Sequence, residues 1–203
     1  MQSRILAAVV VTTFALASSG CDKKPNAAAD STAAATAAAM SADSAMKAAP
    51  PAPPALTDAN IVFILDGASA ADSARGTLAA SKGTSKDVKD FGKMMAGEHH
   101  ALRQAGQELA TKLGVAPMAP SGDMSEMDAK TELDKLNADA KGKTWDQAYI
   151  DYEVTYHQAV LATATKALGA AQSHDLKDLI TKAAPVIQKH LDRALEIQKK
   201  QLM

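Results

Sequence analysis

Several residue types and motifs are scarce or missing in the sequence, and each scarcity argues against one kind of cross-link, partner or active site. It has one cysteine in 203 residues, Cys21, so no disulfide can form within the chain. Aromatic residues make up 3% of it, the net charge is −1, and no basic block is present, so we expect no nucleic-acid partner. It also lacks a glycine-rich phosphate loop and a Gly-x-Ser-x-Gly elbow, which disfavours the commonest nucleotide and hydrolase sites.

The first 20 residues have the pattern of a secretory signal peptide. Arg4 supplies the positive start, and the apolar run over 5–17 is too short to span a bilayer as a helix. Small residues then lead to Gly20 and Cys21, which resembles the bacterial lipobox, where the cysteine is lipidated and becomes the mature N-terminus. The alternative is ordinary cleavage after residues 15–17, which leaves a free exported thiol. We therefore predict a lipoprotein anchored to a membrane through Cys21, in the bacterial cell envelope and facing the periplasm or the exterior.

Residues 21–56 are rich in alanine, serine and proline, and end in the run Pro50–Pro54. They show no apolar stripe that could dock on a core, and a proline run is extended. We interpret them as a disordered tether between the lipidated cysteine and a folded domain over 57–203. The alternative for this segment is one that binds the cell wall.

In residues 57–203, apolar residues recur with the 3.6-residue period of long helices. Apolar residues three and four apart predict helices over 58–81, 86–113, 145–168 and 176–201, with a shorter one over 126–138. Capping is expected from Thr57, Ser85, Thr144, and Ser173 or Asp175, and Pro185 is expected to kink or loosen the last helix. Short links between the first two and the last two long helices predict antiparallel hairpins. The expected fold is all-α, an antiparallel four-helix bundle with a longer connection between its second and third helices.

Three of the four long helices carry a histidine within their apolar stripe, namely His99, His157 and His190. An imidazole without a partner is costly to bury, so this coincidence is the main functional signal. If the helices pack side by side, the three rings can meet at one level. Three carboxylates lie near them in the pattern: Asp72, Glu98 and Glu153. Histidine and carboxylate ligands suit iron, zinc, copper or manganese, and spacing alone does not choose among these ions.

A second interpretation of the same residues is a buried hydrogen-bond network. Imidazoles, carboxylates and the hydroxyls of Tyr149, Tyr152 and Tyr156 could satisfy one another without a metal ion. His100 is expected to lie in solvent, and His174 to lie in a turn and take no part in the site. The sequence leaves both interpretations open.

Four segments resemble a bacterial envelope family of ferritin-like bundles known as domain of unknown function 4142. The segments are DSARGTLA over 72–79, EHH over 98–100, WDQAYIDYEVTYH over 145–157 and APVIQKHL over 184–191. The resemblance covers about 58–195, implies a ferritin-like fold and points to the same three histidines. It supplies no activity, and the carboxylates do not form the paired Glu-x-x-His motifs of di-iron ferritins.

Three functional hypotheses follow from the sequence. The first is an envelope lipoprotein that binds or senses a metal ion through the histidines and carboxylates. The second is a structural or interaction module without catalytic activity, whose histidines bond to one another. The third, a di-metal oxidoreductase, has the least support, so the sequence favours a protein that is not an enzyme. Protein partners and oligomeric state are not indicated.

Overall fold

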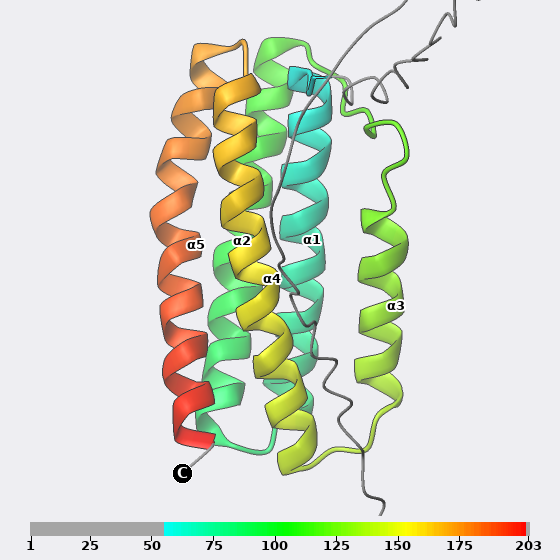
Figure 1. The fold of residues 1–203 in the computed structure, drawn as a ribbon, viewed down its shortest axis with the longest axis vertical. Helices are drawn as coiled ribbons and strands as arrows, with labels where there is room; N and C mark the ends of the chain where they lie inside the picture. The colour runs from blue at the N-terminus through cyan, green and yellow to red at the C-terminus, as the bar shows by residue number, and fades with distance from the viewer. Residues whose placement is uncertain (1–54, 202–203) are drawn as a thin grey trace, which may run out of the picture. The chain divides into compact units, whose positions relative to one another are not determined.

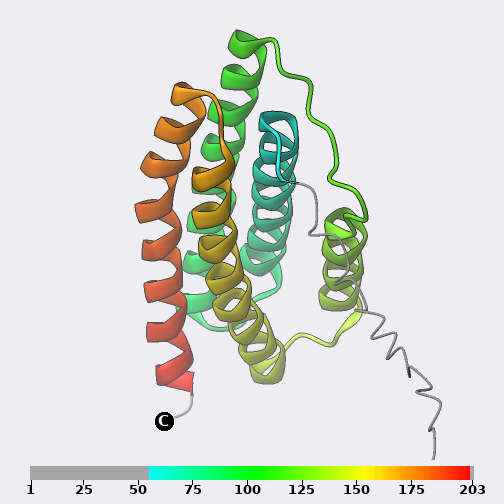
Figure 2. The same ribbon diagram turned by 45° about the horizontal axis from the view of Figure 1, so that its top comes forward.

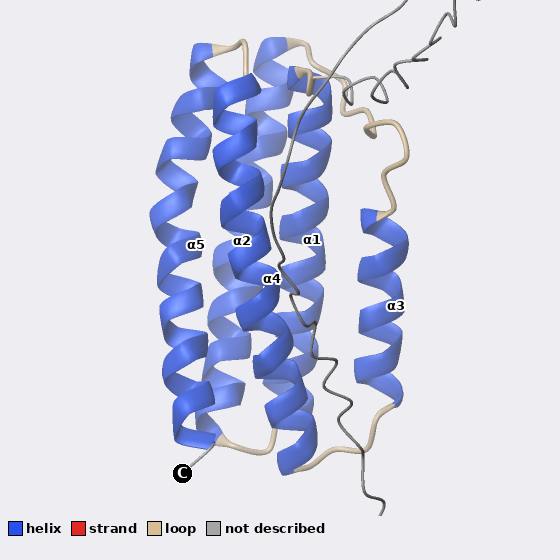
Figure 3. Ribbon diagram, viewed as in Figure 1, coloured by secondary structure: helices blue, strands red, loops and turns tan. Residues whose placement is uncertain are grey.

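A computed structural model of the chain describes residues 55–201, and it contains helices and no strands in that part (Figure 3). The helices are α1 (Asp58–Lys82), α2 (Lys86–Leu113), α3 (Ser125–Ala138), α4 (Lys143–Ala170) and α5 (His174–Gln201). The predicted all-α class is confirmed. The predicted signal peptide, Cys21 and most of the tether lie outside the described residues. None of the described helices is both long and apolar enough to cross a membrane.

The four long helices α1, α2, α4 and α5 lie side by side, and short links make antiparallel pairs of α1 with α2 and of α4 with α5 (Figure 1). The fifth helix, α3, belongs to the connection between α2 and α4 and lies against α1 on the outside (Figure 2). Its C-terminal end is tied down by Leu136, which is fully buried and whose carbonyl oxygen accepts a hydrogen bond from Trp145 Nε1 at 2.7 Å.

Polar residues set several helix ends as the sequence predicted. Thr57 and Asn60 form a capping box at the start of α1, and the side chain of Ser85 accepts a hydrogen bond from the backbone of Val88 at the start of α2. Ser173 accepts one from the backbone N–H of Leu176 in α5, at 3.3 Å.

One expectation about a helix end needs correction. Helix α4 begins at Lys143, after Gly142, so Thr144 lies inside its first turn and caps nothing. Pro185 lies inside α5, which continues past it to Gln201. The start of α4 is fixed by a contact that the sequence did not indicate: the buried carboxylate of Asp146 accepts hydrogen bonds from the link between α1 and α2.

Two glycines bring α1 and α2 unusually close together. A Cβ atom added at Gly76 would lie 2.7 Å from the carbonyl oxygen of Gly92, and one added at Gly92 would lie 2.6 Å from the backbone nitrogen of Ala80. Both distances are shorter than a carbon atom tolerates, so only glycine fits at these two positions. The same approach lets Ser73 Oγ donate to the carbonyl oxygen of Ala96 at 3.2 Å. The close approach also fixes the register of α1 along α2, and thus which residues of the two helices face each other.

The apolar core is divided into two clusters along the helix axes. One cluster lies at the end of the domain where α1 stops and α4 starts, and includes Phe91, Met95, Tyr149 and Ile150. The other lies at the opposite end and includes Ile61, Leu176 and Ile180. A layer of buried polar side chains separates them, and every long helix contributes to it.

Candidate metal centre

The polar layer consists of six side chains at most 1% exposed. They are Asp72 and Arg75 from α1, His99 from α2, Glu153 and His157 from α4, and His190 from α5. Five of the six were expected from the sequence to be candidate site residues. Burying several ionisable groups together is costly unless they are paired or bind an ion. The contacts of these six residues therefore decide whether the layer is a closed network of ion pairs or a site for a bound ion.

The three histidines meet at one level. Their ring centroids are 4.9 Å apart for His99 and His190, 5.6 Å for His157 and His190, and 5.8 Å for His99 and His157. His99 Nε2 lies 3.1 Å from His190 Nδ1. One nitrogen from each ring falls within 4.8 Å of one from each of the others, a spacing that could hold a metal ion.

The partners of His157 and His190 fix which nitrogen of each ring carries the proton. His157 Nδ1 lies 2.9 Å from the carbonyl oxygen of Glu153, and His190 Nε2 lies 2.9 Å from Glu98 Oε2. Both oxygens only accept, so these two nitrogens donate. In the neutral rings, His157 Nε2 and His190 Nδ1 therefore carry lone pairs, and a lone pair is what a metal ion binds.

Arg75 joins the two buried carboxylates. Its Nε donates to Glu153 Oε1 at 2.8 Å, and its Nη2 pairs with Asp72 Oδ1. The face of the guanidinium is covered by aromatic rings: its central carbon lies 4.2 Å from the ring centroid of Tyr156 and 4.9 Å from that of Tyr152. One oxygen of each carboxylate therefore pairs with Arg75, and the other oxygen does not.

Those remaining oxygens have no hydrogen-bond partner among the described residues, nor does one nitrogen of the histidine beside them. These atoms are Asp72 Oδ2, Glu153 Oε2 and His157 Nε2, and in the same layer His99 Nδ1 and Arg75 Nη1 are also unpaired. Asp72 Oδ2 lies 3.5 Å from His99 Nε2, too far for a good hydrogen bond. An unsatisfied buried polar atom costs about 1 to 3 kcal/mol, so five in one layer are unusually costly for a purely structural network.

Electrostatics keep two of the histidines neutral. Burial, reinforced by the neighbouring His190 and His157, lowers the pKa of His99 to about 3. Burial also lowers the pKa of His190. Burial opposes the charge of His157 too, but its contacts with Glu153 and Asp72 outweigh this and raise its pKa. His99 and His190 are therefore uncharged at neutral pH, which is the state that binds a metal ion.

The two carboxylates respond to burial in opposite ways. Burial and the charge of Glu153 raise the pKa of Asp72. Burial acts in the same direction on Glu153, but Arg75 and His157 outweigh it and hold the pKa of Glu153 below its ordinary value. Glu153 therefore carries the firm negative charge that pairs with Arg75, and Asp72 is the carboxyl group whose charge depends on its surroundings.

Comparison with known families identifies the domain. A family model described as Domain of unknown function (DUF4142) matches residues 42–197, a range that contains all six residues of the layer. The chain belongs to the DUF4142 family. The resemblance noted in the sequence is thereby confirmed. No curated protein and no solved structure shows significant similarity to the chain.

The other histidines, the tyrosines and the carboxylate of Glu98, which the sequence analysis of this DUF4142 domain also considered, lie outside the layer. Glu98 is part-exposed, and its carboxylate accepts from His190 Nε2 and from Lys189 Nζ instead of joining the three histidines. His100 is exposed, as expected, and His174, which was expected in a turn, is the exposed first residue of α5. Within residues 55–201, no hydrogen bond joins a tyrosine hydroxyl to a histidine ring. Tyr152 and Tyr156 contact Arg75 through their ring faces, which is not the network that the sequence suggested.

Sequence reasoning missed Arg75. The residue lies in the family-like segment over 72–79, three positions after Asp72 and thus on the same face of α1. Its spacing from Asp72 allowed an ion pair on that face, but its burial depends on Glu153, which α4 brings to it.

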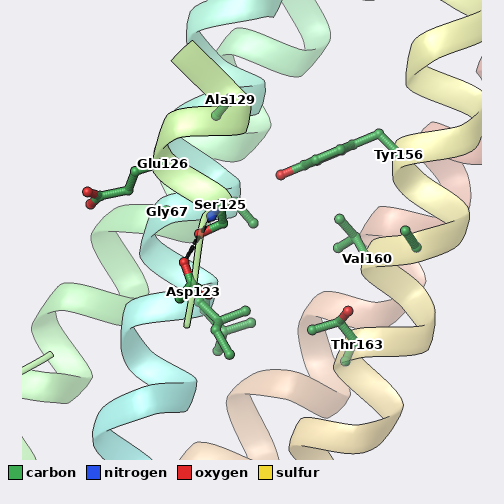
Figure 4. Close-up of a pocket in the computed structure, with 13 residues that line it drawn as sticks. Gly67, Asp123, Ser125, Glu126, Ala129, Tyr156, Val160 and Thr163 are labelled. Carbon is green, nitrogen blue, oxygen red and sulfur yellow. Dashed lines mark hydrogen bonds between the residues drawn. The ribbon is translucent and has the colours of Figure 1, made fainter. Parts of the chain in front are cut away.

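Next to the layer, Tyr156 also lines a hollow with a volume of about 270 Å³ between α1, α4 and the start of α3. Figure 4 shows Tyr156 extending from α4 across this hollow toward α1 and α3, opposite Ser125 and Ala129. The walls that α1 and α4 contribute are mostly apolar, with Ile64 and Val160 among the lining residues, and Thr163 is polar besides Tyr156. The tyrosine ring therefore lies between the hollow and the guanidinium of Arg75.

Proposed function

We propose that this DUF4142 domain binds a metal ion through His99, His157 and His190, with Asp72 as a fourth ligand. The observation that carries the proposal is the pair of unpaired buried atoms, Asp72 Oδ2 and His157 Nε2, beside the contact between His99 and His190. A metal ion would satisfy both atoms at once. Metal sites of this kind in helical bundles are built from side chains on facing helices.

Two distances around His99 suit a single small ion, and Asp72, which groups with Glu153 and His157, would move toward that ion on binding. Two ligands bound to one tetrahedral ion at about 2.0 to 2.1 Å lie about 3.4 Å apart. His99 Nε2 lies 3.1 Å from His190 Nδ1 and 3.5 Å from Asp72 Oδ2. Three imidazoles and one carboxylate, with no thiolate, suit a divalent ion such as zinc, copper, iron or manganese.

The contacts behind the ligands support the same proposal. A histidine that binds a metal usually donates from its other nitrogen to a carboxylate or a backbone carbonyl. His190 donates to Glu98, and His157 donates to the carbonyl oxygen of Glu153. Glu98 and Glu153, both candidate ligands by sequence, would then act mainly by orienting the two rings.

The experiment compares the metal content of three proteins purified without an affinity tag. We expect about one ion per chain in the wild type, and the same in His100→Ala, because His100 is an exposed histidine one position from the site. His157→Ala should lose most of the metal while remaining helical by circular dichroism. Equal metal content in His157→Ala and the wild type would dismiss the site.

A structural hydrogen-bond network is the alternative that a specific observation favours. His99, His190 and Glu98 form a continuous chain of contacts, and Arg75 already pairs with both carboxylates. This network needs no metal, but it leaves unpaired Asp72 Oδ2 and His157 Nε2, the two atoms that the proposed ion would satisfy. If it is the whole role of the layer, zinc should neither bind the wild type nor raise its melting temperature.

The placement of the domain at a membrane is also part of the proposal. The apolar run that leads to Gly20 and Cys21 supports export and lipidation at Cys21, followed by the tether over 21–56. The domain would then lie in the cell envelope, facing the periplasm or the exterior. Cys21→Ser should release the protein from the membrane fraction, and continued membrane association would contradict the anchor.

We also propose that the four long helices form a ferritin-like four-helix bundle to which α3 is added on the outside. The two antiparallel pairs, the long connection between them and the ligands on facing helices support this assignment. An experimental structure in which α3 packs between the long helices would contradict it.

A further inference from the structure

A second set of possible ligands lies beside the three histidines. One oxygen of Asp72, one oxygen of Glu153 and one nitrogen of His157 fall within 4.8 Å of one another. All three residues are fully buried, and each has an unpaired polar atom. Two carboxylates and an imidazole are ligands that a second divalent ion could use. His157 and Asp72 would then be shared between two neighbouring ions.

A permanent cation already lies against this second set. The guanidinium of Arg75 contacts both carboxylates, one through Nε and the other through Nη2. Arginine cannot be deprotonated under conditions in which a protein stays folded. Its position is held from α1 and α4 and from the rings of Tyr152 and Tyr156. A divalent ion bound to the same two carboxylates would therefore face a fixed positive charge in a buried setting, where repulsion is weakly screened.

We propose that Arg75 takes the place of a second metal ion, which makes the centre mononuclear. This inference rests on the proposed function, since it concerns the number of ions that the same layer holds. Arg75 neutralises Asp72 and Glu153 on the side away from the histidines, so one ion remains on the histidine side. Removal of the guanidinium leaves two buried carboxylates without a counter-charge, and these should recruit a second divalent ion.

The test is the number of zinc ions bound by the full chain, measured by calorimetric titration and by metal analysis after dialysis. We expect one ion in the wild type and two in Arg75→Gln. Arg193→Gln is the matched control, because Arg193 also pairs with two carboxylates, those of Asp87 and Glu196, but lies at the surface. It should bind one ion, as the wild type does.

The possible results separate the two proposals. Two ions in the wild type, or one in a folded Arg75→Gln, would overturn the role of Arg75 and leave metal binding intact. No ion in the wild type would overturn metal binding itself, and the inference with it.

A measurement on the wild type covers the case in which Arg75→Gln does not fold. Manganese(II) is added in excess, and its electron paramagnetic resonance spectrum is recorded on the dialysed protein. A single bound ion gives the signal of isolated manganese, which is the expected result. The spectrum of two coupled ions would overturn the inference.

Discussion

Arg75 on α1 donates to Glu153 on α4 at 2.8 Å, although the two residues are 78 positions apart in the chain. The contact joins the antiparallel pair of α1 and α2 to the pair of α4 and α5. The contact between His99 on α2 and His190 on α5 joins the same two pairs through their other helices. The polar layer is therefore both the candidate metal centre and a principal polar connection between the two halves of the domain.

The first prediction concerns the cost of removing Arg75 from the metal-free protein. Arg75→Gln should lower the free energy of unfolding by about 3 to 5 kcal/mol, because it leaves two buried carboxylates without their cation. Adding Asp72→Asn should recover part of this loss, since one of the stranded charges is then gone. Urea unfolding in the presence of a chelator measures both. A double variant less stable than Arg75→Gln alone would contradict the charge argument.

The second prediction concerns the contact between α1 and α2. Gly76→Ala and Gly92→Ala should each destabilise the domain by about 1 to 3 kcal/mol, because the new Cβ atom collides with backbone of the facing helix. Gly97→Ala is the control: no neighbouring atom lies within 4 Å of its added Cβ, so it should be neutral or stabilise α2 by up to about 1 kcal/mol. Thermal unfolding of the three variants tests the contrast.

Metal binding should respond to the same substitutions. The close approach of α1 and α2 holds Asp72 beside His99, so forcing the helices apart moves a proposed ligand away from the histidines. Gly76→Ala and Gly92→Ala should bind zinc more weakly than Gly97→Ala does. Equal zinc affinity in all three would show that the glycine contact does not position the centre.

The third prediction concerns pH. Because the pKa of Glu153 is held below its ordinary value of 4.5, protonation is harder in the folded state than in the unfolded chain. Glu153 therefore stabilises the fold fully above pH 4.5, and this contribution is lost as the pH falls through the lowered pKa. The stability difference between the wild type and Glu153→Gln, about 3 kcal/mol at neutral pH, should shrink under acid. Unfolding of the metal-free proteins between pH 7 and about 2.5 measures it.

A difference that stays constant over this range would mean that Glu153 is not held ionised by Arg75. The comparison with Glu153→Gln is needed because His99 adds to the acid sensitivity. Its pKa is lowered to about 3, so the unfolded chain binds a proton below pH 6.5 that the folded protein resists. Neutral His99 therefore stabilises the fold above pH 6.5, and this contribution also declines toward pH 3.

The fourth prediction concerns Tyr156, whose ring lies between the hollow and Arg75. Tyr156→Ala should cost about 2 to 4 kcal/mol of stability, from lost packing and the lost contact between ring and cation. It should also speed the release of bound zinc to a chelator, because the hollow then opens toward the layer. Tyr156→Phe keeps the ring and should release zinc at the wild-type rate. Equal release from Tyr156→Ala and Tyr156→Phe would exclude the ring as a barrier.

Periodicity made most of the fold predictable from the sequence. Apolar residues three and four apart placed the long helices closely, and cap residues such as Thr57 and Ser85 marked two of their starts. The same periodicity put His99, His157 and His190 on inward faces, where they are buried. The periodicity could not predict the relative positions of the three histidines along the bundle axis, because these positions depend on the register between neighbouring helices.

The register of the helices is set by tertiary contacts between residues that are distant in the sequence. The close backbone contact at Gly76 and Gly92 fixes the position of α1 on α2. Hydrogen bonds to Asp146 fix the start of α4 on the link between those two helices. Neither has a signature in a single sequence, since glycine and aspartate are common in helices for other reasons. Arg75 was missed for a related cause: an arginine is usually a surface residue, and its burial follows only from the carboxylate that α4 brings to it.

The origin of the layer from all four long helices has a consequence for the order of events during synthesis. Of the layer, the first hairpin to be synthesised carries only Asp72, Arg75 and His99, and His190 arrives later on α5, the last of the described helices. A truncated or half-finished chain thus lacks the complete ligand set. Tight capture of an ion would then mark molecules in which all four long helices are present and correctly packed, and would distinguish them from partly synthesised ones.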